Sequence, residues 1–279
     1  MLHIGCHLST SSGFLHMGED ALSINADTFA FFTRNPRGGR SKEADLQDVR
    51  ALIDLMDNHH FAKLVAHAPY TMNLCSNKPE TSSFAIESFA KDIQTMELLP
   101  GNYLNFHPGC HMNQGAETGI SMIVEALNSL LFEGMQTTIL LETMAGKGTE
   151  VGRSFEELAA IRAGIRQELQ PYVGICLDTC HVFDSGYDIV NNLDGVLEEF
   201  DRIIGLEHLH AIHINDSKNP FASHKDRHEK IGKGSIGLAA FERIVTHPAL
   251  RGLPFILETP QDDLSGWGKE IELLRSVEN

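Results

Sequence analysis

The sequence is poor in cysteine and has no long apolar run. Its 279 residues include five cysteines, which show no paired C-x-x-C spacing and follow no secretory leader. An odd, scattered set of this kind argues against a disulfide framework, so we expect a reducing compartment. No stretch approaches the roughly 18 apolar residues that cross a bilayer. These absences predict a cytoplasmic protein that has no membrane partner.

Basic residues are also scarce relative to acidic ones. The chain has 22 Lys and Arg against 38 Asp and Glu, which gives a formal net charge of -16 at pH 7. Taken alone, this balance disfavours nucleic acid or an anionic membrane as a partner. The 15 histidines, by contrast, are a surplus of the residue that most often binds metals. The net charge therefore argues against a nucleic-acid partner, whereas the histidine content indicates a metal site.

Short apolar runs alternate along the chain with segments in which apolar residues recur every three or four positions. The runs predict strands at 2–6, 28–32, 63–66, 103–106, 137–141, 173–177, 210–214 and 254–257. The other segments predict helices at 45–56, 86–98, 120–131, 155–165, 194–204, 239–245 and 267–277. No linker divides the series, so we expect residues 1–279 to form one domain. About 250 residues suffice for a TIM-type (β/α)8 barrel, which we predict, with an open doubly wound sheet as the alternative.

Histidine and acidic side chains stand at the ends of six successive predicted strands, and His181 follows the sixth strand end, Asp178, by three residues. The long polar segment 215–237, which follows the seventh strand, adds two more residues of these types. Because the C-terminal ends of barrel strands meet on the face that carries active sites, we expect all of them at one mouth. The predicted ligands are His67, His107, Glu142, Asp178, His181, His213, Asp226, His228 and Glu258.

Nine ligands are too many for one metal ion. A catalytic zinc takes about three protein ligands and keeps one open position, so the set predicts two or three ions. Mixed nitrogen and oxygen donors favour zinc, with manganese or iron possible. Cys176 and Cys180 flank Asp178, and we expect both thiols to be packing residues. Closely spaced ions suit displacement at phosphorus, which makes phosphoester hydrolysis the predicted chemistry and amide hydrolysis the next choice.

The motifs around these residues resemble those of the endonuclease IV family, the apurinic/apyrimidinic DNA repair endonucleases. They are FTRN at 32–35, HAPY at 67–70, NFHPG at 105–109, LET at 141–143, LDTCH at 177–181, HINDSK at 213–218, KDRH at 225–228 and ILET at 256–259. The resemblance covers nearly the whole chain. The order, spacing and identity of all nine ligand positions agree with the family pattern.

The resemblance implies a barrel with three zinc ions, one of which manganese could replace. By position, His67 and His107 would bind the first ion and Glu142 would bridge it to the second. The second would also take Asp178, His213 and Glu258; the third would take His181, Asp226 and His228. Glu142, Glu258 and Asp178 would be the catalytic residues.

The activity that the resemblance implies is hydrolysis of the phosphodiester 5′ to an abasic site by metal-bound hydroxide. It leaves a 3′-hydroxyl and a 5′-deoxyribose phosphate, and the family also removes blocking groups from 3′ ends. The implied substrate is double-stranded DNA with abasic or 3′-blocked damage, and we expect a monomer.

Family members flip the abasic nucleotide out of the helix and fill the gap from two loops, at positions that match Arg37 and Tyr70 here. Thr71 stands where a larger apolar side chain is common in the family. Basic residues cluster on the loops at Arg34, Arg37, Arg40 and Lys42 and at Lys218, Lys225, Arg227, Lys230 and Lys233. Such clusters can contact phosphates whatever the total charge, and we predict DNA contacts for Arg37, Tyr70, Thr71, Lys218 and Arg227. His7 has no ligand counterpart and is expected to hydrogen-bond a ligand.

Two alternatives remain open. A sugar isomerase or epimerase on a xylose-isomerase-like barrel would need only the four-residue set Glu142, Asp178, His213 and Glu258 for a single metal. It would have no use for the other five ligand positions. A DNA-damage binding module that has lost catalysis would be expected to lack at least one ligand, and none is missing.

Overall fold

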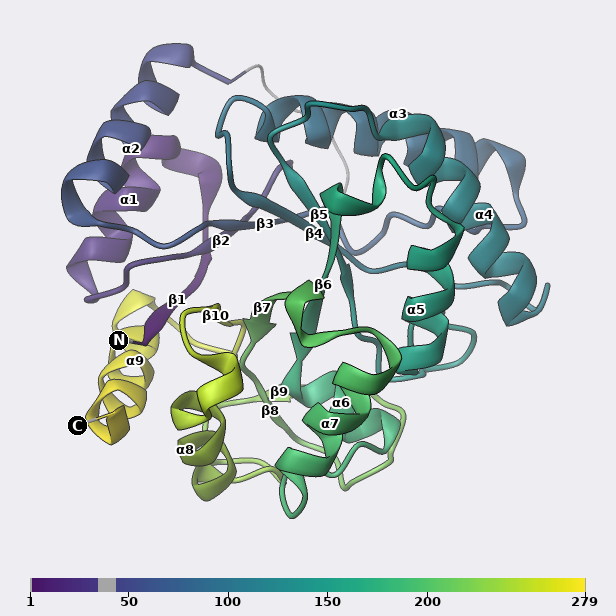
Figure 1. Cartoon of the computed structure of the whole chain (residues 1–279). Helices are drawn as coiled ribbons and strands as arrows, with labels where there is room; N and C mark the ends of the chain where they lie inside the picture. The colour runs from purple at the N-terminus through teal and green to yellow at the C-terminus, as the bar shows by residue number, and fades with distance from the viewer. Residues whose placement is uncertain (1, 35–43, 279) are drawn as a thin grey trace.

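Eight parallel strands close into a barrel in the computed structural model, which describes residues 2–34 and 44–278 (Figure 1). Around the ring the order is β1, β10, β7, β6, β5, β4, β3 and β2. Because β1 pairs with both β10 and β2, the sheet has no edge, and the predicted barrel is confirmed over the open sheet. The barrel strands are β1 (His3–Leu8), β2 (Ala30–Phe32), β3 (Val65–His67), β4 (Tyr103–Phe106), β5 (Thr138–Glu142), β6 (Val173–Asp178), β7 (Leu209–His213) and β10 (Pro254–Leu257).

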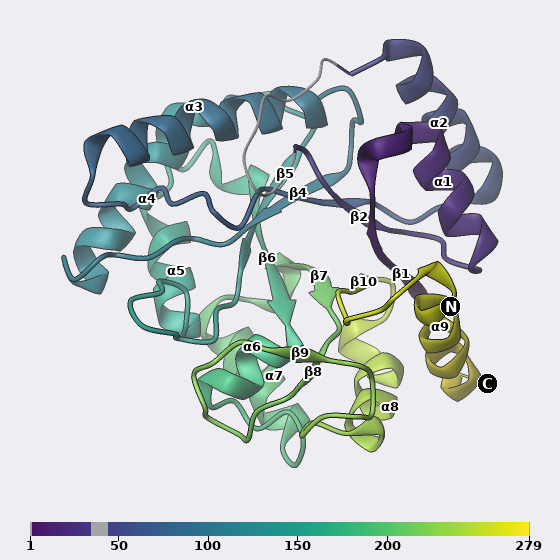
Figure 2. The same cartoon turned by 180° about the vertical axis from the view of Figure 1, so that it is seen from behind.

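Helices surround the ring of strands, and α9 lies beside β1, so that the two ends of the chain are close together (Figures 1 and 2). The α-helices are α1 (Phe14–Ser23), α2 (Leu46–His59), α3 (Pro79–Met96), α4 (Ala116–Leu130), α5 (Phe155–Gly164), α6 (Thr179–Ser185), α7 (Leu193–Ile203), α8 (Leu238–Thr246) and α9 (Leu264–Glu278). Short 3₁₀ turns lie at Thr10–Ser12, Gln170–Tyr172, Leu206–His208 and Pro248–Leu250. No helix in the described part of the chain is both long and apolar enough to cross a membrane.

Several elements begin or end some residues away from their predicted boundaries. Strand β1 continues to Leu8 rather than ending at residue 6, and α3 begins at Pro79 rather than at 86. The prediction missed α1 and α6. Helix α6 has only seven residues, too few for a helical period to be visible, and it begins because the Asp178 side chain accepts a hydrogen bond from the backbone N–H of His181.

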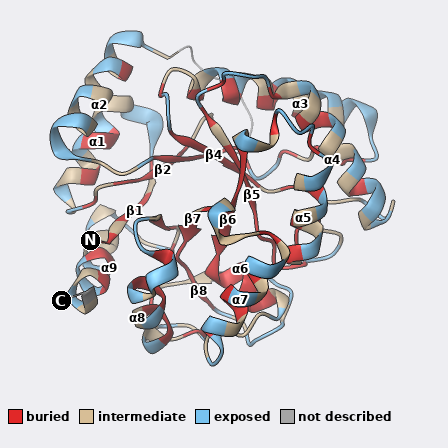
Figure 3. Cartoon of the chain, viewed as in Figure 1, coloured by how far each residue is buried: buried red, intermediate tan, exposed pale blue. Residues whose placement is uncertain are grey.

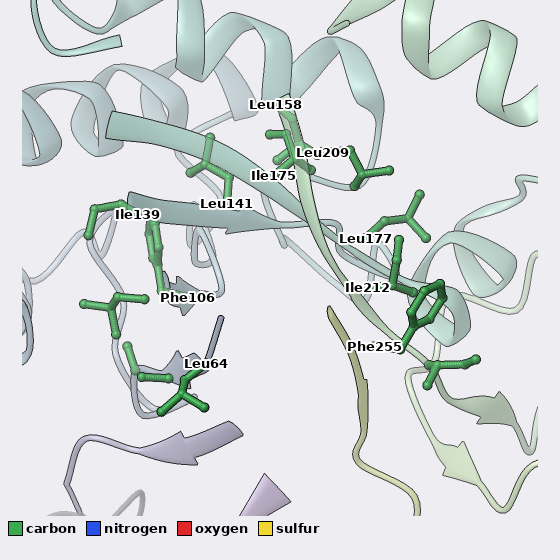
Figure 4. Close-up of a cluster of buried hydrophobic side chains, with 14 of the residues drawn as sticks. Leu64, Phe106, Ile139, Leu141, Leu158, Ile175, Leu177, Leu209, Ile212 and Phe255 are labelled. Carbon is green, nitrogen blue, oxygen red and sulfur yellow. The ribbon is translucent and has the colours of Figure 1, made fainter. Parts of the chain in front are cut away.

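Side chains alternate between the two faces of each barrel strand, and this alternation positions the site. Outward-facing residues such as Leu141, Ile175 and Ile212 join the large core between strands and helices, as Figure 4 shows. Inward-facing residues form a separate small cluster: Ala30, Val65, Tyr103, Leu140, Cys176, Ala211 and Ile256. Figure 3 shows the barrel strands as mostly buried and the helices as buried on one side. The barrel interior is therefore a packed core that supports whatever stands at its mouth.

The long segment after β7 carries two short antiparallel strands that were not predicted. They are β8 (Asp216–Ser217) and β9 (His228–Glu229), with Ser217 opposite His228. The buried Asp216 carboxylate accepts hydrogen bonds from the backbone N–H groups of Gly234 and Ile236 at 2.9 Å each. This polar segment is therefore an ordered part of the fold.

Candidate metal centre

Five of the nine predicted ligands stand two residues after inward-facing residues of the barrel. Val65 precedes His67, Leu140 precedes Glu142, and in the same way Cys176, Ala211 and Ile256 precede Asp178, His213 and Glu258. Because side chains alternate along a strand, the second residue after an inward one also points inward. The ligand-type side chains therefore converge on the C-terminal mouth of the barrel from neighbouring strands.

Glu142 is at the centre of the cluster and is fully buried. Its Oε2 lies 3.0 Å from Nε2 of His67 and 3.3 Å from Nε2 of His107. Its Oε1 lies 3.1 Å from Nδ1 of His213. One carboxylate thus touches imidazoles from three different strand ends, as a bridging group must.

Glu258 extends the cluster toward β1. Its Oε2 lies 3.2 Å from Nδ1 of His213, and its Oε1 lies 3.2 Å from Nδ1 of His7. The His7 ring also packs against Phe32, with ring centroids 4.2 Å apart. His7 therefore has the hydrogen-bonding position expected for it, with its ring fixed between a carboxylate and an aromatic side chain.

The other side of the cluster combines α6 with the segment after β7. Oδ1 of Asp226 lies 3.2 Å from Nε2 of His181 and 3.5 Å from Nε2 of His228. Nε2 of His228 is 3.7 Å from Oδ2 of Asp178, which connects this group to the Glu142 side. All nine predicted residues thus lie in one continuous array.

Neutral polar side chains that the sequence analysis did not single out hold these groups in place. The amide nitrogen of Asn105 donates to Oε2 of Glu142. Asn215 donates to Oδ2 of Asp178 at 2.7 Å and accepts from the backbone N–H of Glu258 at 2.8 Å. The backbone carbonyl of Thr143 lies 2.8 Å from Nδ1 of His181 and fixes the orientation of that ring. Asn105 and Asn215 fall inside the quoted motifs, which was the only signal that could have identified them.

Burial and neighbouring charges shift the pKa values of the clustered side chains in opposite directions. Burial alone would raise the pKa of Glu142, but the imidazoles of His213 and His107 hold it well below its usual range. Burial would also lower the pKa of His181, but Asp178, Asp226 and Glu142 raise it well above its usual range. The same opposition lowers the pKa of Glu258 and raises that of His213. The array strongly favours cations beside its carboxylates.

Several observations test whether metal ions fit this array. The potential ligand atoms of Glu142, Asp178, His213 and Glu258 all lie within 4.8 Å of one another, as do those of two further sets: His67, Glu142 and His213, and Asp178, His181 and His228. Among the described residues, Nε2 of His213 and Nε2 of His228 are buried without a hydrogen-bond partner. A buried carboxylate is destabilised unless a cation compensates its charge. A neutral imidazole nitrogen without a hydrogen-bond partner can donate its lone pair to a metal ion. Divalent ions satisfy both.

One cysteine lies closer to the cluster than predicted. The Sγ atom of the buried Cys180 falls within 4.8 Å of ligand atoms of Asp226 and His228. Burial, followed by the charges of Asp178 and Asp184, raises the pKa of its thiol far above the usual range. A thiol held in its neutral form is a poor ligand, so this observation agrees with the packing role that was expected.

Four of the five predicted DNA contacts are exposed on the loops after β3 and β7, which we call the rim of the mouth: Tyr70, Thr71, Lys218 and Arg227. Tyr70 is 52% exposed, with its ring 6.2 Å from that of Phe32, and Thr71 and Arg227 are also exposed. Nζ of Lys218 lies 3.9 Å from a carboxylate oxygen of Glu229, which partly offsets its charge. Arg37, Arg40 and Lys42 lie outside the described residues, and the DNA contact predicted for Arg37 stays a prediction.

The comparisons with known proteins agree over the full length of the chain. The model of the xylose isomerase-like TIM barrel family matches residues 19–277. A probable endonuclease 4 from Alkaliphilus oremlandii is 61% identical over 277 residues, covering 99% of this chain and 98% of the relative. A probable endonuclease 4 from Clostridium botulinum is 59% identical, with 99% of both chains covered.

Two solved structures match the chain to different degrees. The crystal structure of endonuclease IV from Thermus thermophilus matches with a TM-score of 0.87 and 30% identity, covering 99% of this chain and 98% of that one. A D-tagatose 3-epimerase-like protein matches with a TM-score of 0.68 and 19% identity, covering 99% of this chain and 97% of that one. The second match shows a shared barrel fold alone.

Proposed function

The chain belongs to the endonuclease IV family, and on this premise we propose that it hydrolyses the phosphodiester 5′ to abasic sites in double-stranded DNA. The products would be a 3′-hydroxyl and a 5′-deoxyribose phosphate, and the same site would remove blocking groups from 3′ ends. The observation that carries the proposal is the convergence of nine His, Asp and Glu side chains on one barrel mouth. We also propose that the protein is cytoplasmic and monomeric and that it forms one domain.

We assign three zinc ions to this mouth, with manganese possible at one of them. The holding residues would be His67, His107 and Glu142 for the first, Glu142, Asp178, His213 and Glu258 for the second, and His181, Asp226 and His228 for the third. Closely spaced zinc ions lower the pKa of coordinated water and neutralise the charge of a phosphodiester. Nitrogen and oxygen donors without a thiolate suit zinc at a catalytic site.

Neighbouring side chains hold the proposed metal ligands in fixed positions. Glu142, held by Asn105 and by three imidazoles, keeps the two halves of the array at a fixed separation. Asn215 does the same for Asp178 and Glu258. Orientation of ligands by such neighbours typically affects metal affinity or activity by about 10- to 100-fold.

The rim residues would select the damaged site. Tyr70 projects from the loop after β3 with half of its surface exposed, and Arg227 stands on the loop after β7 beside Asp226. Extruding a nucleotide costs a few kcal/mol and is cheapest where the base is already missing. An exposed aromatic side chain at the mouth could fill the resulting gap.

A sugar isomerase or epimerase is the second candidate, favoured by one observation. Glu142, Asp178, His213 and Glu258 form a compact group that one divalent ion could occupy by itself. The remaining five residues distinguish the two functions, because an enzyme with a single metal has no need of His107, His181 or Asp226 within 3.3 Å of another ligand-type side chain.

The decisive experiment uses a duplex with one tetrahydrofuran abasic analogue and a 5′ label on the damaged strand. Zinc-loaded protein should cut directly 5′ to the analogue, and a DNA polymerase should extend the product because it ends in a 3′-hydroxyl. A chelator should abolish cutting and added zinc should restore it. An intact duplex after incubation with fully metallated protein would contradict the proposal. Conversion of a ketose sugar by protein that holds one ion per chain would favour the second candidate.

A further inference from the structure

A buried carboxylate outside the proposed ligand set holds the segment that carries two of the ligands. Asp184 lies on α6, three residues after His181, and is fully buried. Figure 2 shows the segment with β8 and β9 beside α6. A buried carboxyl group must be hydrogen-bonded to be tolerated, so its partners indicate which parts of the chain it holds.

The first oxygen of Asp184 holds His228 through a neighbouring strand. Oδ1 accepts a hydrogen bond from the Ser217 hydroxyl at 2.7 Å. Ser217 belongs to β8 and stands directly opposite His228 of β9. The position of the His228 backbone thus depends on a residue that Asp184 fixes.

The second oxygen holds Asp226 directly. Oδ2 accepts a hydrogen bond from the backbone N–H of Asp226 at 2.9 Å, and the backbone carbonyl of Asp184 accepts from the N–H of His224 at 3.0 Å. Ala222, His224 and Asp226 have φ values of 57°, 55° and 54°, in the left-handed region that side chains other than glycine rarely adopt. Such a backbone persists only where the surrounding contacts determine it.

We propose that Asp184 is a positioning residue that sets Asp226 and His228 for the third metal ion, and that it thereby controls how tightly this ion binds. The inference rests on the proposed function for the existence of that ion. Asp184 touches neither ligand side chain. It acts on the backbone of one ligand and, through Ser217, on the strand partner of the other.

The neighbouring Asp216 provides a matched control. It is also fully buried and belongs to the same segment. Its carboxylate accepts from the backbone N–H of Ser217 and from those of Gly234, Ile236 and Gly237, so three of its four partners lie in the downstream half of the segment. Removing either carboxylate should destabilise the fold, but Asp216→Ala should affect the third ion much less than Asp184→Ala, because the hydrogen bond to the backbone of Asp226 comes from Asp184.

The test is a zinc titration of the full chain against a chromophoric chelator, without DNA, on wild type, Asp184→Ala, Asp184→Asn and Asp216→Ala. We expect three ions in wild type and Asp216→Ala. Asp184→Ala should bind the third ion about 10- to 100-fold more weakly and the other two unchanged. Asp184→Asn should recover most of the affinity, because its amide oxygen can still accept from the Asp226 N–H.

The possible results distinguish the positioning role of Asp184 from the proposed metal centre. Three tightly bound ions in Asp184→Ala, or an equal loss in Asp216→Ala, would overturn the positioning role and leave the proposed function intact. Fewer than three ions in wild type would count against the proposed metal centre itself. If Asp184→Ala does not fold, Ser217→Ala tests the part of the inference that concerns His228: it should weaken the third ion by a few-fold, and wild-type affinity in this variant would overturn that part.

Discussion

Two histidines on the same strand, His210 and His213, have opposite electrostatic environments. His210 lies at the N-terminal end of the barrel, stacked on Tyr103 with ring centroids 5.5 Å apart. Burial and the nearby charge of Lys63 lower its pKa to about 4. At the other end, burial would likewise lower the pKa of His213, but Cys176 and the carboxylates of Glu258 and Glu142 raise it well above its usual range.

The contrast shows that histidine content alone says little about function. The N-terminal end uses an imidazole as a neutral ring for packing, while the C-terminal mouth surrounds imidazoles with carboxylates. Only the second arrangement can hold cations. The barrel thus separates a structural end from a chemical end, as this fold generally does.

The largest expected difference between the two ends is in turnover. Glu142→Gln should retain the fold but lose more than about 100-fold in cleavage of the abasic duplex, because the neutral amide cannot bridge two ions. Tyr103→Phe, on the adjacent strand at the packed end, should stay within about twofold of wild type. Initial rates with zinc-loaded proteins measure both. Near-normal cleavage by Glu142→Gln would remove the carboxylate from the mechanism.

The acidic and histidine residues proposed as ligands could be located at one mouth from the sequence because of where they stand. The run Phe255, Ile256, Leu257 ends in a carboxylate at Glu258, and such a boundary is visible without knowledge of the fold. The alternation of inward and outward residues then brings all such strand ends to one mouth.

Other parts of the centre depend on which strands are neighbours. Asn105 reaches Glu142 from β4 to β5, and Asn215 connects β6 to β10, so neither contact can be recognised from spacing. Asp184 lies on a helix too short to show a period, and its partners come from a distant segment. The overall charge was misleading for a similar reason, since a net value does not show that Arg227 stands beside the mouth.

Metal removal should destabilise the protein through the chemical end only. A site that is occupied at about 1,000 times its Kd contributes about 4 kcal/mol. For a protein of this size, the loss of one such site corresponds to a decrease in Tm of roughly 7 °C. Thermal melts with and without chelator should show this decrease in wild type and in Tyr103→Phe, and a smaller one in Glu142→Gln. Identical melts with and without chelator would argue against bound metal.

Between about pH 6.5 and 4, acid should act on the packed end of the metal-free protein. Because the folded pKa of His210 lies below the unfolded value, the neutral ring contributes stability that is present above about pH 6.5 and is lost as the pH falls toward 4. After allowance for solvent screening, this loss amounts to about 1 to 2 kcal/mol. Urea unfolding of metal-free protein at several pH values should show a shallower acid limb in His210→Gln. An unchanged slope would contradict the lowered pKa.

The smallest expected effect is in DNA binding. Arg227→Ala should weaken binding of a damaged duplex by a few-fold and reduce the salt dependence by about one phosphate contact. Lys63→Ala, which removes a charge at the packed end, is the matched control and should change neither quantity. Fluorescence anisotropy at several salt concentrations measures both variants. Equal effects of the two substitutions would show that net charge, rather than the rim of the mouth, governs binding.

Catalysis should depend on several metal ions at the chemical end of the barrel. The most direct measurement is the metal content of one protein preparation, set against its initial rate on the tetrahydrofuran duplex as zinc is added back stepwise to the chelated protein. The rate should stay near zero with one ion per chain and reach its full value only when three ions are bound. Full activity with a single ion, or with none, would contradict this dependence.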